Sequence, residues 1–197
     1  MNKFEEEPFD PYVRPLDYEA IRRVQRLKRR EVYLFEEIDS ITVKEIIEDI
    51  LIMDEDKEKR PITFYIDSPG GSVGDGFALI NILQNCKCPI RMVGLGEVAS
   101  MACAIYTVGT RGLRLIGENT WFLFHPVMVG VRDDYIKFQK SRILQGEEIE
   151  KVYDDIILSH SEIPREIYRK AKDTELWLPP KKLLEYKIAD EIYIRQT

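Results

Sequence analysis

Hydrophobic positions recur along this chain with two different periods. Short runs of β-branched and aromatic residues, typical of buried strands, alternate with stretches whose apolar residues return every three or four positions, as in helices that bury one face. The strands predicted in this way are residues 32–34, 62–66, 90–95, 113–116, 121–124 and 192–194. The predicted helices cover residues 22–30, 43–51, 77–83, 101–108 and 133–159, with two shorter ones after Pro164 and Pro180. This alternation, with short connections, predicts an α/β fold with a largely parallel sheet.

The longest helical pattern, from Asp133 to Ser159, exceeds the length of an average helix. We expect part of this helix to project from the domain, and a second subunit to cover its apolar stripe. The stripe consists of Ile136, Ile143, Ile149, Val152, Ile156 and Ile157. Near the other end of the chain, Ser40 or Thr42 is the expected N-cap of the helix over 43–51.

The first 17 residues combine prolines with acidic and aromatic residues, which predicts an extended arm ahead of a single domain over residues 18–197. The basic stretch from Arg22 to Arg30 alternates its charges with apolar residues in the spacing of an amphipathic helix. The net charge of −6 argues against contact with nucleic acid. We therefore interpret this stretch as a solvated or subunit-facing helix.

Composition narrows the class of protein further. The chain has 197 residues, of which 44% are hydrophobic, and this excludes a disordered or collagen-like protein. The sequence contains no run of 18 apolar residues, which excludes a membrane-spanning helix. The acidic start does not resemble a secretory signal. The cysteines Cys86, Cys88 and Cys103 form neither a zinc-binding nor a disulfide pattern. We expect a cytoplasmic protein, or one of a plastid stroma or an infected-cell cytosol, with reduced thiols in its core.

Candidate chemistry begins with the two histidines. His125 ends the apolar strand over 121–124, whereas His160 ends the long helix, where a capping or solvated role is expected. A lone histidine at a strand end is usually structural, so a catalytic role for His125 needs support from other segments.

Two turns supply that support. Gly70 and Gly71 close a predicted strand and precede a helix, so their backbone N–H groups are approachable and suit an oxyanion. The segment matches neither common glycine-rich phosphate-binding pattern. Ser100 stands between a strand and an alanine-rich helix. A hydroxyl there is either an N-cap or a nucleophile whose acyl intermediate the N–H groups of the helix start would stabilise. Spacing alone leaves both interpretations open.

Three segments, YIDSPGGSV, GEVASM and FHP, resemble motifs of the ClpP peptidase family in their order and nearly in their separations. LLEYKIADEI resembles the closing segment of that family, and the similarity covers about residues 30–194. The resemblance implies a ClpP/crotonase-like spiral of β-α-β units with a projecting handle helix. It also implies a serine endopeptidase that cleaves peptides and unfolded proteins inside stacked rings of subunits, with two heptamers as the expected assembly.

The resemblance assigns roles to individual residues. Ser100 matches the nucleophile, and His125 matches the general base that takes its proton and later gives it to the leaving amine. The backbone N–H groups of Gly71 and Met101 match the oxyanion hole. Further positions are expected beside the peptide substrate: Gly70, Ser72 and the strand over 62–66.

The third member of the triad stays open between two acids. Counting back from EYKIAD, the Asp of the family aligns with Glu175, whereas residue type favours Asp173, and either carboxylate could hold the imidazole tautomer. The chain departs from the family pattern in FHP, which lacks the residue that commonly separates the histidine from the proline. It departs again at Lys187, where the family has glycine.

No cofactor or metal is expected, and the absence of a Walker motif argues against ATP as a cofactor of this chain. The resemblance implies a possible AAA+ unfoldase as a partner, but the N-terminal arm does not resemble the apolar segment through which family members contact it, which counts against that partner. Two alternatives to a peptidase are a catalytically inactive ring subunit and a crotonase-fold acyl-CoA enzyme. The latter typically uses glutamate as acid or base and needs no Ser–His pair.

Overall fold

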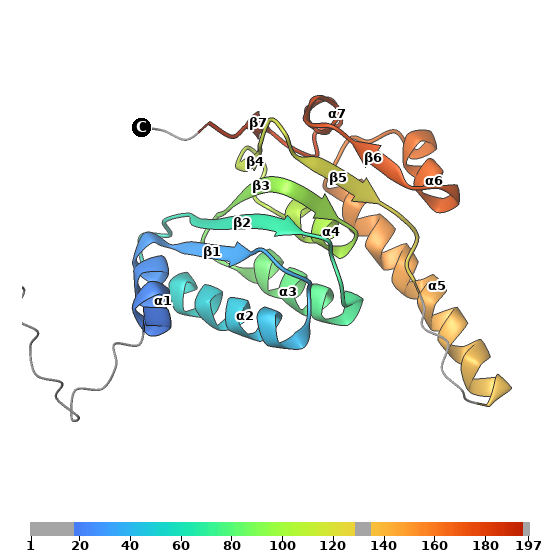
Figure 1. Ribbon diagram of the computed structural model, residues 1–197, viewed down its shortest axis with the longest axis horizontal. Helices are drawn as coiled ribbons and strands as arrows, with labels where there is room; N and C mark the ends of the chain where they lie inside the picture. The colour runs from blue at the N-terminus through green and yellow to red at the C-terminus, as the bar shows by residue number, and fades with distance from the viewer. Residues whose placement is uncertain (1–17, 129–134, 195–197) are drawn as a thin grey trace, which may run out of the picture.

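The computed structural model describes residues 18–128 and 135–194, and within these ranges the chain forms an α/β fold (Figure 1). The strands are β1 (Glu31–Leu34), β2 (Ile62–Ser68), β3 (Ile90–Ala99), β4 (Arg114–Ile116), β5 (Trp121–Phe124), β6 (Leu176–Leu178) and β7 (Glu191–Ile192). The helices are α1 (Tyr18–Arg29), α2 (Ser40–Asp54), α3 (Val73–Asn85), α4 (Met101–Thr107), α5 (Ile136–Ser159), α6 (Arg165–Asp173) and α7 (Pro180–Glu185). The predicted fold class is confirmed, while the expected arm over residues 1–17 lies outside the described ranges.

The strands form a sheet in the order β1-β2-β3-β4-β7, in which every neighbouring pair is parallel. β5 pairs with the last residues of β3, again in parallel. β6, which the sequence pattern does not predict, pairs antiparallel with β5. The expectation of a largely parallel sheet is therefore confirmed, and crossover helices join the parallel strands as in β-α-β units.

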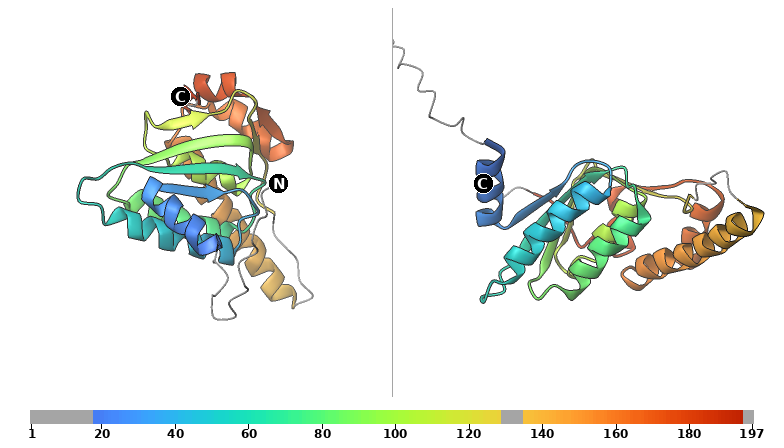
Figure 2. Two further views of the ribbon diagram at one scale, coloured as in Figure 1. Left: turned by 60° about the vertical axis from the view of Figure 1, so that its left-hand side comes forward. Right: turned by 90° about the horizontal axis from the view of Figure 1, so that it is seen from below.

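Helices α2, α3 and α4 cover one face of this sheet (Figure 1), and the right-hand view of Figure 2 shows α2 and α3 side by side. In β2, Ile62, Phe64 and Ile66 are fully buried, whereas Tyr65 between them is half-buried because alternate side chains of a strand point to opposite faces. Tyr65 stacks on Tyr33 of β1 with 5.2 Å between the ring centroids. None of the described helices is long and apolar enough to cross a membrane.

Helix α5 leaves the core and projects from the rest of the molecule (Figure 1). Its second half is anchored by Tyr153 and Ile157, which are buried. Its first half exposes four large apolar side chains: Ile136, Phe138, Ile143 and Leu144. The expected projection is confirmed, although the expected start of the helix at Asp133 lies outside the described ranges. Exposed apolar surface of this kind is typical of an interaction site.

The boundary of α2 corrects one expectation. The N-cap is Asp39, whose Oδ1 accepts the backbone N–H groups of Ile41 at 3.0 Å and Thr42 at 2.8 Å. The expected caps at Ser40 and Thr42 are therefore wrong. Asp39 has the extended backbone of an N-cap residue, and from that position its carboxylate satisfies two N–H groups of the first turn that have no intrahelical partner.

A buried ion pair ties the last strands to the sheet. Arg114 of β4 is 2% exposed in its side chain and forms a bidentate pair with Asp190, with Nε to Oδ2 at 3.0 Å and Nη2 to Oδ1 at 2.8 Å. Arg114 Nη1 also donates to the carbonyl of His160 at the end of α5. Burial alone would raise the pKa of Asp190, but hydrogen bonds and charge from Arg114, with the N–H of Gly112, hold it below its ordinary value.

Candidate active site

Four strand ends meet at one edge of the sheet. The carboxyl ends of β2, β3 and β5 lie together because these strands are parallel neighbours, and the antiparallel β6 brings its amino end to the same edge. The turn Gly70–Gly71 follows β2, Ser100 follows β3, His125 follows β5 and Glu175 precedes β6. The fold thus gathers these residues at the edge where open α/β sheets generally bind their ligands.

Ser100 is the residue between β3 and α4, and its backbone has an unusual conformation. Its φ of +54° and ψ of −125° are sparsely populated by residues other than glycine, and such a conformation costs about 1–3 kcal/mol. Two hydrogen bonds hold it: the Ser100 N–H donates to the carbonyl of Leu123, and the hydroxyl of Tyr153 donates to the Ser100 carbonyl, both at 2.8 Å. A strained strand-to-helix turn of this kind exposes a nucleophile above a sheet.

The Ser100 hydroxyl does not cap the helix that follows it. Ser100 occupies the N-cap position of α4, but its side chain accepts no N–H group from the first turn. Ser72, in the corresponding position before α3, does accept the N–H of Asp75, at 3.3 Å. Of the two interpretations that spacing left open, the capping one therefore lacks its hydrogen bond at Ser100.

Gly70 packs directly against Ser100. A Cβ atom on Gly70 would lie 2.6 Å from Ser100 Cβ, 2.7 Å from the carbonyl oxygen of Ala99 and 3.0 Å from the nitrogen of Met101. The φ of Gly70 is +94°, which L side chains rarely adopt. Glycine is therefore required here both for its conformation and for the close approach of two backbone segments.

Two backbone N–H groups at this contact have no acceptor among the described residues: those of Gly71 and Met101. Ile38 bonds to the residues on either side of Gly71, since its N–H donates to the carbonyl of Gly70 and its carbonyl accepts the N–H of Ser72, both at 2.8 Å. The Gly71 N–H consequently faces away from Ile38. The Met101 N–H belongs to the first turn of α4, where N–H groups have no intrahelical partner. Because a Cβ on Gly70 would lie only 3.0 Å from the Met101 nitrogen, the Gly70–Gly71 turn approaches Met101 closely, and the two donors can stabilise a developing oxyanion.

His125 follows β5, the strand that receives the hydrogen bond from Ser100. Its Nδ1 lies 2.7 Å from the carbonyl oxygen of Pro126. A proton on Nδ1 satisfies that carbonyl and leaves the Nε2 lone pair free to act as a base. Within the described ranges no hydrogen bond joins the His125 ring to Ser100, Asp173 or Glu175, and such bonds commonly tighten only when substrate binds. The Pro126 contact was not predicted, because no sequence pattern signals a bond between a side chain and the next carbonyl.

The two candidate acids differ in their relation to His125. The last residue of β5 faces the first residue of β6, so one further step of the antiparallel register sets Glu175 opposite His125. Asp173 is the last residue of α6 and lies outside the strand pairing. Both acids are exposed, and Glu175 Oε2 accepts the indole N–H of Trp177 at 3.0 Å.

A second serine–histidine pair, Ser159 and His160, belongs to the end of α5. His160 Nδ1 lies 3.0 Å from Ser159 Oγ and 2.8 Å from the carbonyl oxygen of Ile156. The Ser159 hydroxyl also donates to the Ile156 carbonyl, at 3.2 Å. Both side chains therefore satisfy a carbonyl of the last helical turn, and the expected capping role of His160 is confirmed.

The cysteines are not nucleophiles in this fold. All three are free, Cys88 and Cys103 are buried, and Cys86 is half-buried. Burial, with a hydrogen bond to Asp54, raises the pKa of the Cys86 thiol to about 12, so it stays protonated at neutral pH. In the part of the chain that the structure describes, no cluster of three or more His, Cys, Asp or Glu side chains could hold a metal ion.

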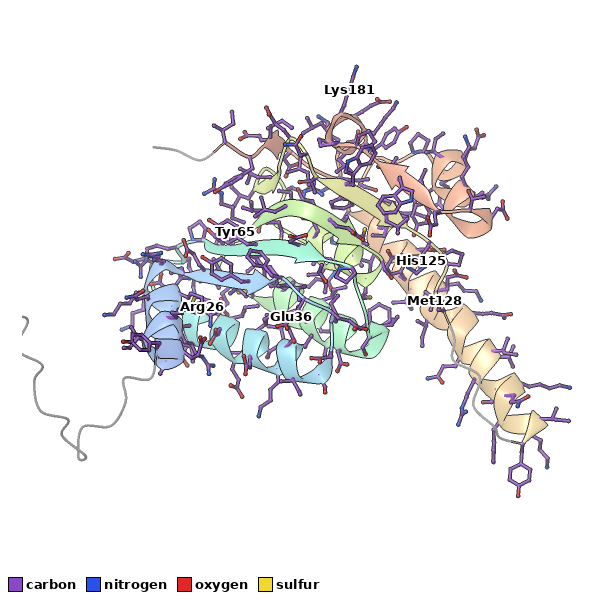
Figure 3. All side chains as sticks on the ribbon, viewed as in Figure 1. Arg26, Glu36, Tyr65, His125, Met128 and Lys181 are labelled. Carbon is purple, nitrogen blue, oxygen red and sulfur yellow. The ribbon has the colours of Figure 1, made fainter. Side chains whose placement is uncertain are left out.

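A hollow of about 300 Å³ adjoins the site, between the start of α3 and the side of α5. Val73, Val127 and Ile149 line it together with Met128, which is 84% exposed. Figure 3 shows His125 at the end of β5 and Met128 beyond it, along α5. Arg142 and Gln145 also line the hollow, so its apolar part, close in sequence to Ser72 and His125, suits an apolar side chain of a bound peptide.

Known proteins match this chain over nearly its whole length. Residues 17–196 match the Clp protease family. The ATP-dependent Clp protease proteolytic subunit 2 of Thermobifida fusca (strain YX) is 29% identical over 185 residues, which cover 93% of this chain and 89% of the relative. The protein of the same name from Treponema denticola is 27% identical over 169 residues, covering 84% of this chain and 82% of the relative. The chain therefore belongs to the Clp protease family.

Proposed function

We propose that this chain is a serine endopeptidase that cleaves peptides and unfolded proteins. The observation that carries the proposal is Ser100, whose hydroxyl stands on a strained strand-to-helix turn and makes no capping bond. Two neighbouring N–H groups, at Gly71 and Met101, have no acceptor within the described ranges and would give the same turn an oxyanion site. Membership of the Clp protease family supports this chemistry, since the relatives from Thermobifida fusca and Treponema denticola bear the name proteolytic subunit.

In the proposed mechanism, Ser100 Oγ attacks the scissile carbonyl carbon while His125 Nε2 takes the hydroxyl proton. The negative charge that develops on the carbonyl oxygen is stabilised by the N–H groups of Gly71 and Met101. His125 then gives its proton to the leaving amine, and the C–N bond breaks to leave an acyl-Ser100 ester. Water, deprotonated by the same imidazole, hydrolyses the ester and restores the Ser100 hydroxyl.

We assign the third member of the triad to Glu175 rather than to Asp173. The strand register supports Glu175, because extending the β5–β6 pairing by one residue beyond Phe124 and Leu176 would set Glu175 opposite His125. A carboxylate there would stabilise the imidazolium that forms when the histidine takes the serine proton. For this bond to form, the His125 ring must release the Pro126 carbonyl, which now accepts from Nδ1.

The proposed assembly is a pair of stacked heptameric rings that enclose the active sites. The exposed apolar side chains on the first half of α5 support a contact between subunits at this handle helix. The relatives from Thermobifida fusca and Treponema denticola are named as subunits of an ATP-dependent Clp protease. We accordingly propose a Clp ATPase as the partner that delivers unfolded chains to these rings.

Reaction with a fluorophosphonate probe, followed by intact-mass analysis, tests the proposal. We expect one adduct on the parent protein and none on Ser100→Ala. Ser159→Ala is a matched control, because that serine also neighbours a histidine but belongs to a helix cap, and it should be labelled like the parent. Failure to label the parent assembly, together with no peptide hydrolysis, would favour the inactive ring subunit. Hydration of an acyl-CoA without labelling would favour the crotonase-type enzyme.

A further inference from the structure

The hydroxyl of Tyr153 reaches the nucleophile turn from a distant helix. Tyr153 lies in the second half of α5 and is 4% exposed. Its hydroxyl donates to the carbonyl oxygen of Ser100 at 2.8 Å, although 53 residues separate the two in sequence. Burial raises the pKa of this phenol well above its ordinary value, so the group is a neutral donor at any physiological pH.

The bond acts on more than the Ser100 carbonyl. The carbonyl of Ser100 and the N–H of Met101 belong to one planar, trans peptide unit, in which the C=O and N–H bonds point in opposite directions. Fixing the oxygen on one side therefore fixes the direction of the N–H on the other. A hydrogen bond to the carbonyl also polarises the peptide unit, which makes its N–H a stronger donor.

This peptide unit needs an external support. The Ser100 conformation is strained, and such conformations persist only where the surroundings over-determine them. The Ser100 carbonyl also accepts the N–H of Cys103 at 3.0 Å, but Cys103 belongs to α4 and moves with the turn. Tyr153 belongs to α5, so its hydroxyl sets the orientation of the turn relative to a separate helix.

We propose that Tyr153 is a positioning residue that orients and polarises the Met101 N–H for the oxyanion, an inference that depends on the proposed peptidase function. The charge on the substrate oxygen develops in the transition state, so loss of this support should lower kcat and leave KM nearly unchanged. Removing one donor of an oxyanion hole outright costs about 10²–10³-fold in kcat. Loss of its orientation alone should cost less, about tenfold.

Tyr153→Phe, compared with Tyr168→Phe in the full assembly, tests this. Tyr168 is a second buried tyrosine, and its hydroxyl donates at 2.9 Å to Asp154 rather than to Ser100. Tyr153→Phe should fold, because the Ser100 carbonyl keeps the Cys103 N–H as a donor. We expect it to lower kcat for a model peptide. It should weaken the binding of a peptide boronate, which forms a tetrahedral adduct on the serine, by the same factor. Binding of the cleaved product peptide should be unchanged, and Tyr168→Phe should retain the parent kcat.

Each remaining outcome overturns the inference in a distinguishable way. If Tyr153→Phe keeps the parent kcat, or if both variants lose activity equally in step with thermal stability, the hydroxyl is only structural. A rise in KM without a change in kcat would place its effect on substrate binding instead. If the parent itself neither binds boronate nor reacts with the fluorophosphonate, the proposed peptidase function fails and this inference fails with it.

Discussion

The contact between Gly70 and Ser100 makes Gly70→Ala the sharpest test of the site geometry. The added Cβ would lie 2.6 Å from Ser100 Cβ and 2.7 Å from the carbonyl oxygen of Ala99. Neither neighbour is the free end of a long side chain. The Ser100 N–H is already committed to the Leu123 carbonyl, so the turn has little room to yield.

Two costs add in this variant. The φ of +94° puts an alanine in the left-handed half of backbone space, which costs about 1–2 kcal/mol, and overpacking adds about 1–3 kcal/mol. We therefore expect a loss of about 2–5 kcal/mol in the free energy of unfolding. Carbon atoms pack best about 3.5–4.0 Å apart, so relief of the contact requires a shift of about 1 Å. A displacement of that size at a reacting group can lower kcat/KM about 10²-fold.

Gly74→Ala is the matched control for this variant. Gly74 lies four residues further on, at the start of α3, and a Cβ added there meets no atom within 4 Å. An alanine in that helix should raise the stability by up to about 1 kcal/mol and leave the activity unchanged. The assays are thermal unfolding and peptide hydrolysis on both variants. If Gly70→Ala cleaves peptides as fast as Gly74→Ala, the close packing of the glycine turn on Ser100 is wrong.

Three further outcomes follow from the described contacts. Glu175→Gln should lower kcat by up to about 10⁴-fold, while Asp173→Asn should leave it near the parent value; equal activity in both would mean that the backbone carbonyl beside the imidazole is sufficient. Asp190→Asn should lower the free energy of unfolding, measured by chemical denaturation, by about 3–5 kcal/mol, because it leaves the buried charge of Arg114 without its partner. Glu185→Gln, which breaks an exposed pair with a lysine, should lower it by less than about 1 kcal/mol. The pKa of Asp190 is lower in the folded protein than in the unfolded chain, where it is near 3.8. The stability that Asp190 contributes should therefore be complete above the unfolded pKa and be lost as the pH falls through the lower folded value. Unfolding of the parent and of Asp190→Asn as a function of pH measures this difference.

Periodicity predicted the fold well because the buried segments are long enough to show it. In β2 three fully buried residues alternate with more exposed ones, and each of the seven residues of α4 is buried, including the large side chain of Tyr106. Such patterns show which residues of an element face the core, and the spacing of those residues distinguishes a helix from a strand. The site residues Ser100 and His125 followed from ordered motifs, since each stands at a strand end next to a recognisable segment.

Hydrophobic periodicity could not predict contacts between segments that are remote in sequence. The hydrogen bond from Tyr153 to the Ser100 carbonyl joins α5 to the turn before α4, and no local pattern distinguishes this tyrosine from any other buried aromatic residue. The cap at Asp39 was missed for a different reason: the apolar periodicity of α2 starts at Val43, four residues inside the cap. Hydrophobic spacing locates the buried turns of a helix and says little about its polar first turn.

The missed strand β6 is also what separates the two candidate acids. Its partner β5 ends about fifty residues earlier in the chain, so no neighbouring pattern indicates the pairing. Extending the β5–β6 register by one residue beyond Phe124 and Leu176 would set Glu175 opposite His125, whatever the type of acid. Under the proposed assignment, two features meet beside the imidazole: His125 is followed at once by Pro126, whose carbonyl accepts from Nδ1, and the acid is a glutamate, one methylene group longer than an aspartate. In the proposed mechanism the longer side chain would let the carboxylate compete with that carbonyl when the imidazole becomes charged, because a charged ring favours an anion over a neutral acceptor.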